Sequence, residues 1–331
     1  MNIRPFQLPR DIDLMNSLVM HGFQYPENPE WSVQEDEKQG MIDRINGAKR
    51  LWPILLAMRA VSPLFRDILC GFIAEEENKP VGLINYMRQR NEPEWFIANV
   101  TVLPAYRRRG IARKLVEATL NELRHRQAKV AFLDVVDGND PAFKLYQKMG
   151  FDAFAISSKY HYQRDDSITQ LPLPEGYSIK PLGMFDWQTR FNLDKLIIPE
   201  HITQYEPVTE GRYRVPVIMP IFGKLFEAAG GTHNEQFAIH SPKGEIAGIG
   251  QYTYRTRAGG VNFVNVSIDP HHTGLADFIM SYVFSSIQKA SPGHRIELNL
   301  ENWQSSLIES ADTLGCEKRF GSHRMGVRFQ S

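Results

Sequence analysis

The chain has 331 residues, 42% of them hydrophobic and 23% charged, and its Lys plus Arg and Asp plus Glu counts are both 38. This length favours two globular domains, the composition argues against disorder, and the balanced charge argues against a protein drawn to nucleic acid by its overall field. The two cysteines, Cys70 and Cys316, belong to no paired motif, which argues against a disulfide framework or structural zinc site and favours a reducing compartment.

The start of the chain does not resemble a signal peptide. Met1–Phe6 lacks an apolar core segment and Asp11 follows closely, so we expect a cytoplasmic protein. The most apolar stretch, Leu51–Leu69, contains Pro53 and Arg59, which a membrane-spanning helix would rarely hold together. We expect a helix and a turn there, packed over a sheet, with an acyl-binding role as the alternative.

The first half then alternates between strand and helix patterns. Short apolar runs predict strands at Gly71–Glu75 and Val81–Met87, and a longer run rich in β-formers predicts a strand at Glu94–Leu103. Helical spacing of apolar residues follows over Gly110–Arg126, and a strand pattern returns at Lys129–Val136. A strand, a helix and a strand in this order predict a parallel crossover.

A further helix follows this strand. Pro141 suits its first turn, where a missing N–H costs nothing, with Asn139 or Asp140 as the cap. Gly150 suits the residue after its C-terminus.

The segment that joins the predicted strand at Glu94–Leu103 to the helix at Gly110–Arg126 indicates a ligand site. Gly110 and Ala112 have almost no side chain, so main-chain N–H groups at the helix start can approach an anion, and Arg107, Arg108 and Arg109 add positive charge. This predicts a pyrophosphate site. The segment lacks the Gly-Lys-Ser/Thr of a P-loop and the third glycine of the dinucleotide fingerprint, which disfavours ATP and NAD. The alternative is a solvated turn of three arginines.

The context of this segment resembles the acetyl-CoA loop of the GNAT N-acetyltransferase superfamily. The likeness consists of a strand ending in Val-x-Pro, then Arg-x-x-Gly-x-Ala at Arg107, Gly110 and Ala112, with Tyr146 and the ending Lys148–Phe151 further on. It implies acetyl-CoA as the cosubstrate, whose pantetheine arm pairs with the strand around Asn99–Val102. It further implies direct attack of an amine on the thioester, without an enzyme nucleophile or a metal. The residues implied in cofactor binding are Val100, Thr101, Val102, Arg107, Arg108, Arg109, Gly110, Ile111, Ala112, Arg113 and Asn139.

The same resemblance suggests the catalytic groups. Tyr146, two helical turns after Asn139, is similar to the family's frequent tyrosine acid; the alternative is a packed aromatic residue. Asp134 occupies a position similar to the glutamate base of ribosomal-protein N-acetyltransferases, and would need burial or a relaying water to act as a base. Glu94, Glu92 or a bound water are the competing bases. Asn139 is equally explained as a helix cap or as a cofactor ligand.

The second half repeats the first. Gly82–Tyr86 resembles Gly248–Tyr252, and Asn99–Pro104 resembles Asn265–Pro270, at one shared offset of 166 residues. We therefore predict an α/β (α+β) fold of two tandem GNAT-like domains, residues 1–163 and 176–331, joined by a linker at 164–175. Each would be a mixed central sheet flanked by helices. This organisation resembles the mycothiol synthase type of tandem GNAT protein.

The loop of the second half departs from the pattern. Asp269–Ala276 contains no arginine and is two residues shorter from its proline to its alanine, so we expect a degenerate domain. His271 and His272 could hold an anion or, less readily, a metal. Four aromatic residues could line a substrate pocket or, as we prefer, cover a domain interface: Tyr252, Tyr254, Phe263 and Trp303.

These observations predict an N-acetyltransferase that acts on a small-molecule or peptide amine, as a monomer or homodimer, without nucleic-acid, membrane or metal partners. The alternative is a non-catalytic acyl-CoA-binding sensor or scaffold, because a phosphate loop reports binding and not turnover. Nucleic-acid binding through Arg107–Arg109 and Arg124–Arg126 is a weaker third hypothesis.

Overall fold

The computed structural model describes residues 1–61, 66–89, 92–163, 168–215 and 219–329. The first four linker residues, 164–167, and the middle of the predicted Leu51–Leu69 segment, 62–65, lie outside these ranges. Among the described residues, no helix is both long enough and apolar enough to cross a lipid bilayer.

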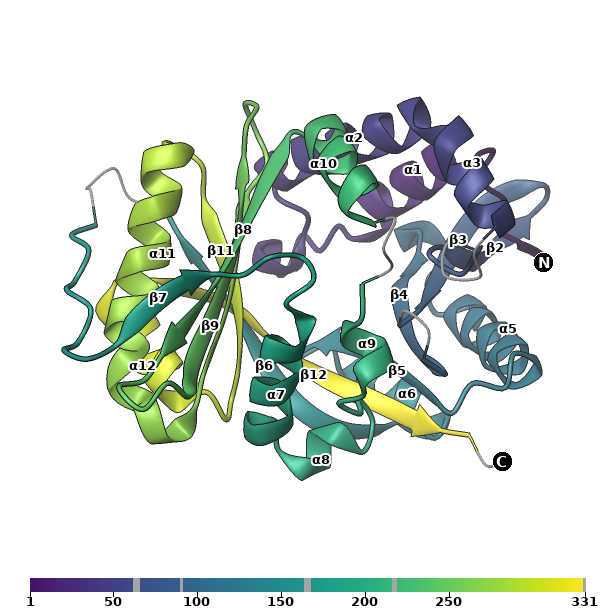
Figure 1. The fold of residues 1–331 in the computed structure, drawn as a ribbon. Coiled ribbons are helices and arrows are strands. Elements are labelled where there is room, and N and C mark those ends of the chain that lie inside the picture. Colours follow the sequence, from purple (N-terminus) through teal and green to yellow (C-terminus); the bar gives the residue numbers. More distant parts are fainter. Residues whose placement is uncertain (62–65, 90–91, 164–167, 216–218, 330–331) are drawn as a thin grey trace.

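The elements of the two halves follow the same order (Figure 1). The first half contains β1 (Asn2–Pro5), α1 (Ile12–Gly22), η1 (Pro29–Trp31), α2 (Glu35–Arg50), α3 (Trp52–Val61), β2 (Cys70–Glu76), β3 (Lys79–Arg88), β4 (Glu94–Val102), η2 (Pro104–Tyr106), α5 (Ile111–His125), β5 (Val130–Val136), α6 (Asp140–Lys148) and β6 (Asp152–Tyr162). The second half contains β7 (Ser178–Pro181), α7 (Trp187–Ile197), α8 (Glu200–Thr203), α9 (Glu210–Tyr213), α10 (Met219–Gly230), β8 (Thr232–His240), β9 (Ile246–Arg255), β10 (Asn262–Ile268), η3 (Pro270–Leu275), α11 (Ala276–Ala290), β11 (Ile296–Glu301), α12 (Ser305–Thr313) and β12 (Glu317–Arg328). The predicted strands and helices around the phosphate loop are confirmed to within a residue or two of their ends.

The described strands form one mixed sheet in the order β1-β2-β3-β4-β5-β12-β6-β11-β10-β9-β8-β7. The last strands of the two halves have changed places. β12 pairs with β5 of the first half, whereas β6 pairs with β11 of the second. β12 and β6 also pair with each other, so the centre of the sheet belongs to both halves.

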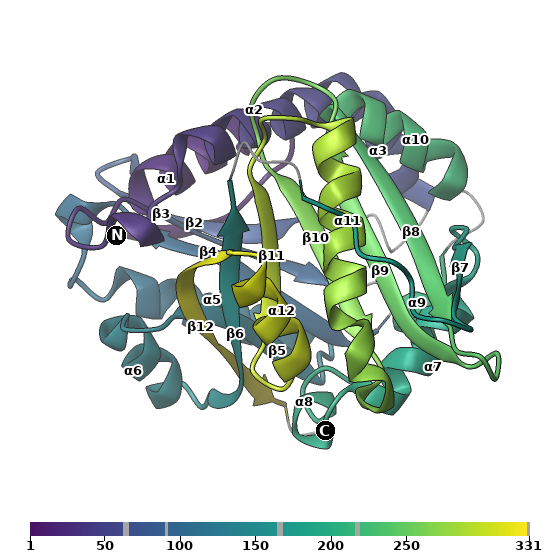
Figure 2. The same cartoon turned by 90° about the vertical axis from the view of Figure 1, so that its left-hand side faces the viewer.

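Helices cover the sheet because their apolar faces match it. In the first half, α5 buries Ile111, Leu115, Leu120 and Leu123 against the sheet, and α6 adds Tyr146 to the same core. In the second half, α11 buries a similar stripe, and α11 and α12 lie over the same part of the sheet (Figure 2). A buried apolar stripe of this kind supplies most of a helix's stability in a folded protein.

The helices between the first two strands of each half reach across to the other half. α10 of the second half packs against α2 of the first (Figure 1). Ile202 of α8 and Tyr205, just after it, pack on Val130 and Phe132 of β5. The halves are therefore joined by helices on the sheet as well as by exchanged strands.

Candidate active site

The segment between β4 and α5 forms an open ring of main-chain amides. Arg108 and Gly110 have φ values of +66° and +77°, which turn the chain sharply before the helix begins. Within the described residues, the amides of Arg108 to Arg113 donate no hydrogen bond to protein; the next amide, that of Lys114, bonds to Gly110 O. A Cβ placed on Gly110 would meet no atom within 4 Å. The first turn of α5 thus presents unpaired donors to open space, the arrangement that binds an anion.

The side chains of the four arginines in this segment make different contacts. The Arg107 guanidinium donates to Gly22 O at 2.7 Å and to Val102 O at 3.3 Å, and lies over the Tyr25 ring. Arg109 donates to Ala105 O, and Arg113 pairs with Glu117 on the helix surface. Arg108 is exposed and contacts no charged partner in the described part of the chain. Arg107 therefore fixes the loop after α1, and Arg108 is the guanidinium available to a ligand.

A gap opens beside this loop, between β4 and β5. The two parallel strands pair only from Glu94–Phe96 to Val130–Phe132 and then separate. β4 also carries a bulge against β3, where the register shifts and Asn99 takes a φ of +50°. The edge of β4 that faces β5 is consequently free from the bulge to the phosphate loop. Such bulges re-aim main-chain groups and are frequent next to active sites.

Tyr146 and Asp134 flank this gap from opposite faces of the sheet. Tyr146 is 5% exposed, packs beside Phe151, and its hydroxyl has no hydrogen-bond partner among the described residues. Burial raises the pKa of Tyr146 above its ordinary value. Leu133 and Val135 share its core, so strand alternation directs Asp134 to the other face.

Asp134 is held by an arginine of the second half. Arg324 of β12 contacts the Asp134 carboxylate at 3.1 Å and also pairs with Glu206 and Glu301. Burial nevertheless raises the pKa of Asp134. The sequence analysis did not find Arg324, because nothing in the local pattern of β12 indicates that it lies beside β5.

Two further predicted residues have clear positions. The Asn139 side chain accepts a hydrogen bond from Ala142 N at 3.3 Å, so its role as the cap of α6 is confirmed. Glu94, at the closed end of the gap, is 3% exposed, and its Oε2 has no partner among the described residues. Burial, and then the neighbouring Glu92, raise the pKa of Glu94 to about 7.

A small cavity of about 300 Å³ lies at the β4 bulge, between the two halves. Its lining includes Asn99 with residues of α1 and α2 on one side and of β8 to β11 on the other. Glu37 and Lys159, 2.9 Å apart, lie at its wall. Burial would raise the pKa of Glu37, but Arg319 and Lys159 lower it to about 2. The cavity wall is therefore charged but internally paired.

The corresponding loop of the second half has internal hydrogen bonds and no arginine. The Asp269 carboxylate accepts hydrogen bonds from His271 N and lies 2.8 Å from His271 Nδ1. His272 Nδ1 lies 2.8 Å from the Tyr177 hydroxyl. β10 pairs with β9 in one unbroken register, without the bulge of β4. The Asp269 carboxylate thus takes up one main-chain amide of this loop, although a Cβ on Gly274 would meet no atom within 4 Å and β10 separates from β11 after Val264, as β4 does from β5.

The four aromatic residues of the second half divide between cores and cavities. Tyr252 and Tyr254 stack on each other at the C-terminal core. Phe263 lines the small cavity between the halves, as the preferred interface interpretation implied. Trp303 lines a larger cavity of the second half.

Comparisons with known proteins point to one family. The model of the acetyltransferase (GNAT) family matches residues 34–151. A [ribosomal protein bS18]-alanine N-acetyltransferase of Haemophilus ducreyi is 36% identical over 69 residues, which are 21% of this chain and 48% of that protein. An N-alpha-acetyltransferase of Saccharolobus solfataricus is 32% identical over 115 residues, 30% of this chain and 66% of that protein. The chain thus spans about half the length of the first of these relatives.

Two solved structures resemble the whole chain. A tandem GNAT protein from the clavulanic acid biosynthesis pathway has a TM-score of 0.65 at 14% identity, covering 100% of this chain and 99% of that one. A GCN5-related N-acetyltransferase from Sphaerobacter thermophilus has a TM-score of 0.66 at 11% identity, covering 99% and 96%. At these identities the likeness shows a shared tandem fold.

Proposed function

We propose that this chain, which carries a domain of the GNAT acetyltransferase family, transfers an acetyl group from acetyl-CoA to a primary amine. The observation that carries the proposal is the ring of unpaired amides at the start of α5, which opens beside the gap between β4 and β5. A diphosphate is the ligand that fits such a ring. The amides of Arg108 to Arg113 would bind it, with the Arg108 guanidinium adding charge and Arg107 holding the adjoining loop in place.

The remaining part of the cofactor would lie in the gap. Its amide-bearing pantetheine arm would pair with the free edge of β4 along Val100, Thr101 and Val102, as a third strand pairs with a sheet edge. The thioester would then reach the bulge at Asn99. Asn139 would contribute to this site mainly by starting α6, because its side chain already caps that helix.

The reaction needs one base and one acid. A lysine-like amine has a pKa of about 10.4 and must lose a proton before its nitrogen attacks the thioester carbon. The carbon–sulfur bond then breaks, and the departing thiolate, whose conjugate thiol has a pKa of about 8.5, takes a proton. We assign the acid to Tyr146, whose hydroxyl is free of protein partners. Asp134 is our assignment for the base, acting on the opposite face of the gap.

Asp134 and Glu94 both have raised pKa values, so Glu94 competes with Asp134 for the role of the base. Asp134 is the better placed of the two, because it lies beyond the part of β5 that pairs with β4. Its ion pair with Arg324, however, stabilises the carboxylate and makes it a weaker base. Glu94 has a pKa of about 7, close to the value that suits a general base, but lies at the closed end of the gap. Asp134→Asn should lower kcat more than Glu94→Gln at pH 8, and the reverse order would assign the base to Glu94.

The small cavity at Asn99 supports the choice of acceptor. At about 300 Å³ it can hold a single side chain, a peptide N-terminus or a small amine, and it meets the bulge where the thioester would lie. Residues of both halves line it, so the acceptor would touch both. The reaction requires no metal, and we place the protein in the cytoplasm as a monomer or homodimer.

The test combines turnover with binding. Release of free CoA from acetyl-CoA in the presence of a panel of amines and N-terminal peptides should exceed hydrolysis without amine. Arg108→Ala should weaken acetyl-CoA binding about tenfold in calorimetric titration, as expected for loss of a charge-assisted contact. Arg50→Ala, at an exposed position of α2, is the matched control and should leave the affinity unchanged.

The alternative function, non-catalytic binding of acyl-CoA, predicts a different pair of results. Acetyl-CoA would bind and Arg108→Ala would weaken it, but no amine would raise the release of CoA. Equal acetyl-CoA affinity in the wild type and in Arg108→Ala would contradict both functions, because both rest on the same loop.

A further inference from the structure

Residues 23–34, between α1 and α2, form a strap across the gap in which the cofactor would lie. Gly22, just before the strap, packs so closely on β4 that a Cβ there would collide with the Thr101 side chain. Near the other end, Trp31 packs against the turn after β5, where a Cβ on Gly138 would lie 3.3 Å from the Trp31 ring. The strap therefore passes from β4 to β5 beyond the part where these strands pair.

Both ends of the strap belong to the small cavity that we assign to the acceptor. Phe23 and Val33 line this cavity together with Asn99, where the thioester would lie. The middle of the strap lies near the assigned acid, because burial and, after it, the charge of Tyr25 raise the pKa of Tyr146. The shape of the acceptor wall therefore depends on where the strap is held.

Two guanidinium groups hold the strap. Within the described chain, the main-chain hydrogen bonds that join residues 23–34 to elements other than α1 and α2 come from Arg107 and Arg319. Arg107 of the first half reaches the start of the strap, where it donates to Gly22 O at 2.7 Å and to Gln24 O at 3.5 Å. Arg319 of the second half reaches the other end. The strap is thus fixed at one end by the phosphate loop and at the other by the second half.

Arg319 lies at a bulge of β12. The register of β12 against β6 shifts at this position, and bulges of this kind re-aim a side chain. The side chain is 6% exposed and donates to Glu30 O at 2.7 Å, to Ser32 O at 2.6 Å and to the Glu37 carboxylate at 2.6 Å. One planar guanidinium thus satisfies two carbonyl groups of the strap and a carboxylate in the first turn of α2.

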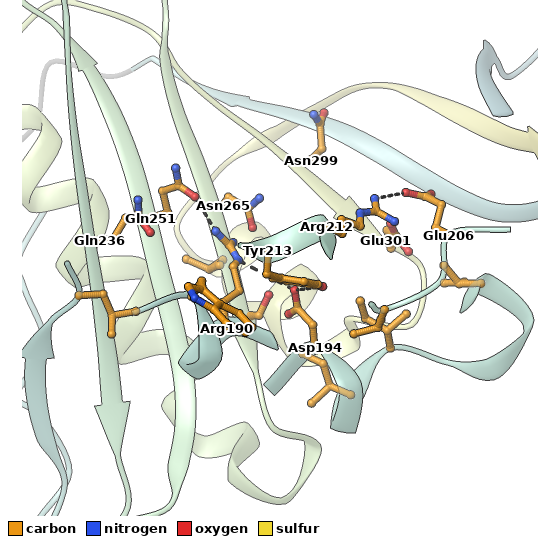
Figure 3. A pocket seen from close by; sticks show the side chains of 18 of the residues that line it. Arg190, Asp194, Glu206, Arg212, Tyr213, Gln236, Gln251, Asn265, Asn299 and Glu301 are labelled. Atoms are coloured by element: carbon orange, nitrogen blue, oxygen red, sulfur yellow. Dashed lines mark hydrogen bonds and ion pairs between the residues drawn. The ribbon is translucent and has the colours of Figure 1, made fainter. Parts of the chain in front are cut away.

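β12 carries a second arginine that reaches the first half, but its contacts are of another kind. Arg324 binds the carboxylates of Asp134, Glu206 and Glu301, and the last two lie at the wall of the larger cavity that Trp303 lines (Figure 3). Of the two arginines, Arg319 is therefore the one that holds the backbone of the strap. We propose that Arg319 is a positioning residue for the acetyl transfer of the proposed function, on which its role rests: it fixes the strap, and with it the wall that the amine acceptor meets.

The test compares Arg319→Lys with Arg328→Lys, the same change at an exposed position of the same strand. A lysine keeps the charge but does not reproduce the planar fork that spans both carbonyl groups. Hydrogen exchange of the amides of residues 23–34, read by mass spectrometry, should therefore be about tenfold faster in Arg319→Lys and unchanged in Arg328→Lys. If Arg319→Lys does not fold, Glu37→Gln takes its place, because it weakens the contact of Arg319 with α2 and should also speed this exchange.

Kinetics with an amine that the wild type acetylates complete the test. The KM of the amine should rise about tenfold in Arg319→Lys, while kcat and the affinity for acetyl-CoA stay within about twofold, because Arg107 still holds the other end of the strap. A purely structural role would lower kcat through loss of folded enzyme and leave KM unchanged. The proposal is overturned if exchange in residues 23–34 matches the wild type or if the KM of the amine does not change. Absence of turnover in the wild type would overturn the proposed function as well, so the two failures are told apart.

Discussion

Glu94 offers a stability test whose size follows from its surroundings. Its carboxyl group is 3% exposed at the start of β4, and one oxygen has no partner among the described residues. Burial and the charge of Glu92 raise its pKa from 4.5 to about 7, more than Arg212, Lys129 and Arg88 lower it. The native state therefore holds a proton that the unfolded chain releases between these two values.

The sign and size of the effect follow from this difference. Below pH 4.5 both states are protonated, so Glu94 adds no pH dependence. Between pH 4.5 and about 7 the native state binds more protons, so the free energy of unfolding falls as the pH rises. At about 1.4 kcal/mol per pKa unit, the full loss above pH 7 is about 3 kcal/mol. Glu94→Gln removes the ionisation, so its gain over the wild type should be about 2 kcal/mol larger at pH 8 than at pH 5.

Urea denaturation at pH 5 and pH 8 measures this difference directly. Glu309→Gln is the matched control, since Glu309 is exposed on α12, and its effect should be nearly the same at both pH values. The reasoning fails if Glu94→Gln is no more favourable at pH 8 than at pH 5. That result would mean that Glu94 ionises in the native state as readily as in the unfolded chain.

Three other changes test separate parts of the structure. Arg107→Ala should lower the free energy of unfolding by about 1–3 kcal/mol as well as weaken acetyl-CoA binding, because it loses charge-assisted bonds to Gly22 and Val102; calorimetric scanning and titration measure the two effects. Tyr146→Phe should lower kcat at least about tenfold while leaving acetyl-CoA affinity unchanged, and an unchanged kcat would remove it as the acid. Deletion of residues 317–331 should abolish acetyl-CoA binding, because β5 loses its neighbour; retained binding would show that the first half folds without β12.

The turn before α5 could be predicted from the sequence because its requirements are local. A turn with Gly110 in a left-handed conformation, followed by a helix start with unpaired amides, depends on residues within one short segment. The strands β4 and β5 separate after Phe96, which leaves the strand around Asn99–Val102 unpaired on that side, as pairing with a pantetheine arm would require. Adjacent residues determine a turn of this kind, so it can be predicted from a single sequence.

The partners of the site residues could not be predicted in the same way. β6 and β12 occupy matching places in the repeat, so each carries a pattern that suits either half, and pairing energy alone does not say which neighbour it takes. For this reason Arg324 beside Asp134, and Lys159 beside Glu37, were not found. The same limit applies to the large cavity that Trp303 lines, because its lining comes from both halves of the chain.

The strand exchange also predicts that the first half needs the last strand of the second half. Met325 of β12 is fully buried in the core around α5 and α6, whereas Cys316, just before β12, lies in the core around α11. β6 does the reverse, since Tyr160 and Tyr162 pack into the second core. Each core thus contains part of the other half, and neither can lose its partner without losing buried apolar area of its own. The last strand of the second half should therefore support the first half whether or not the second half binds a phosphate.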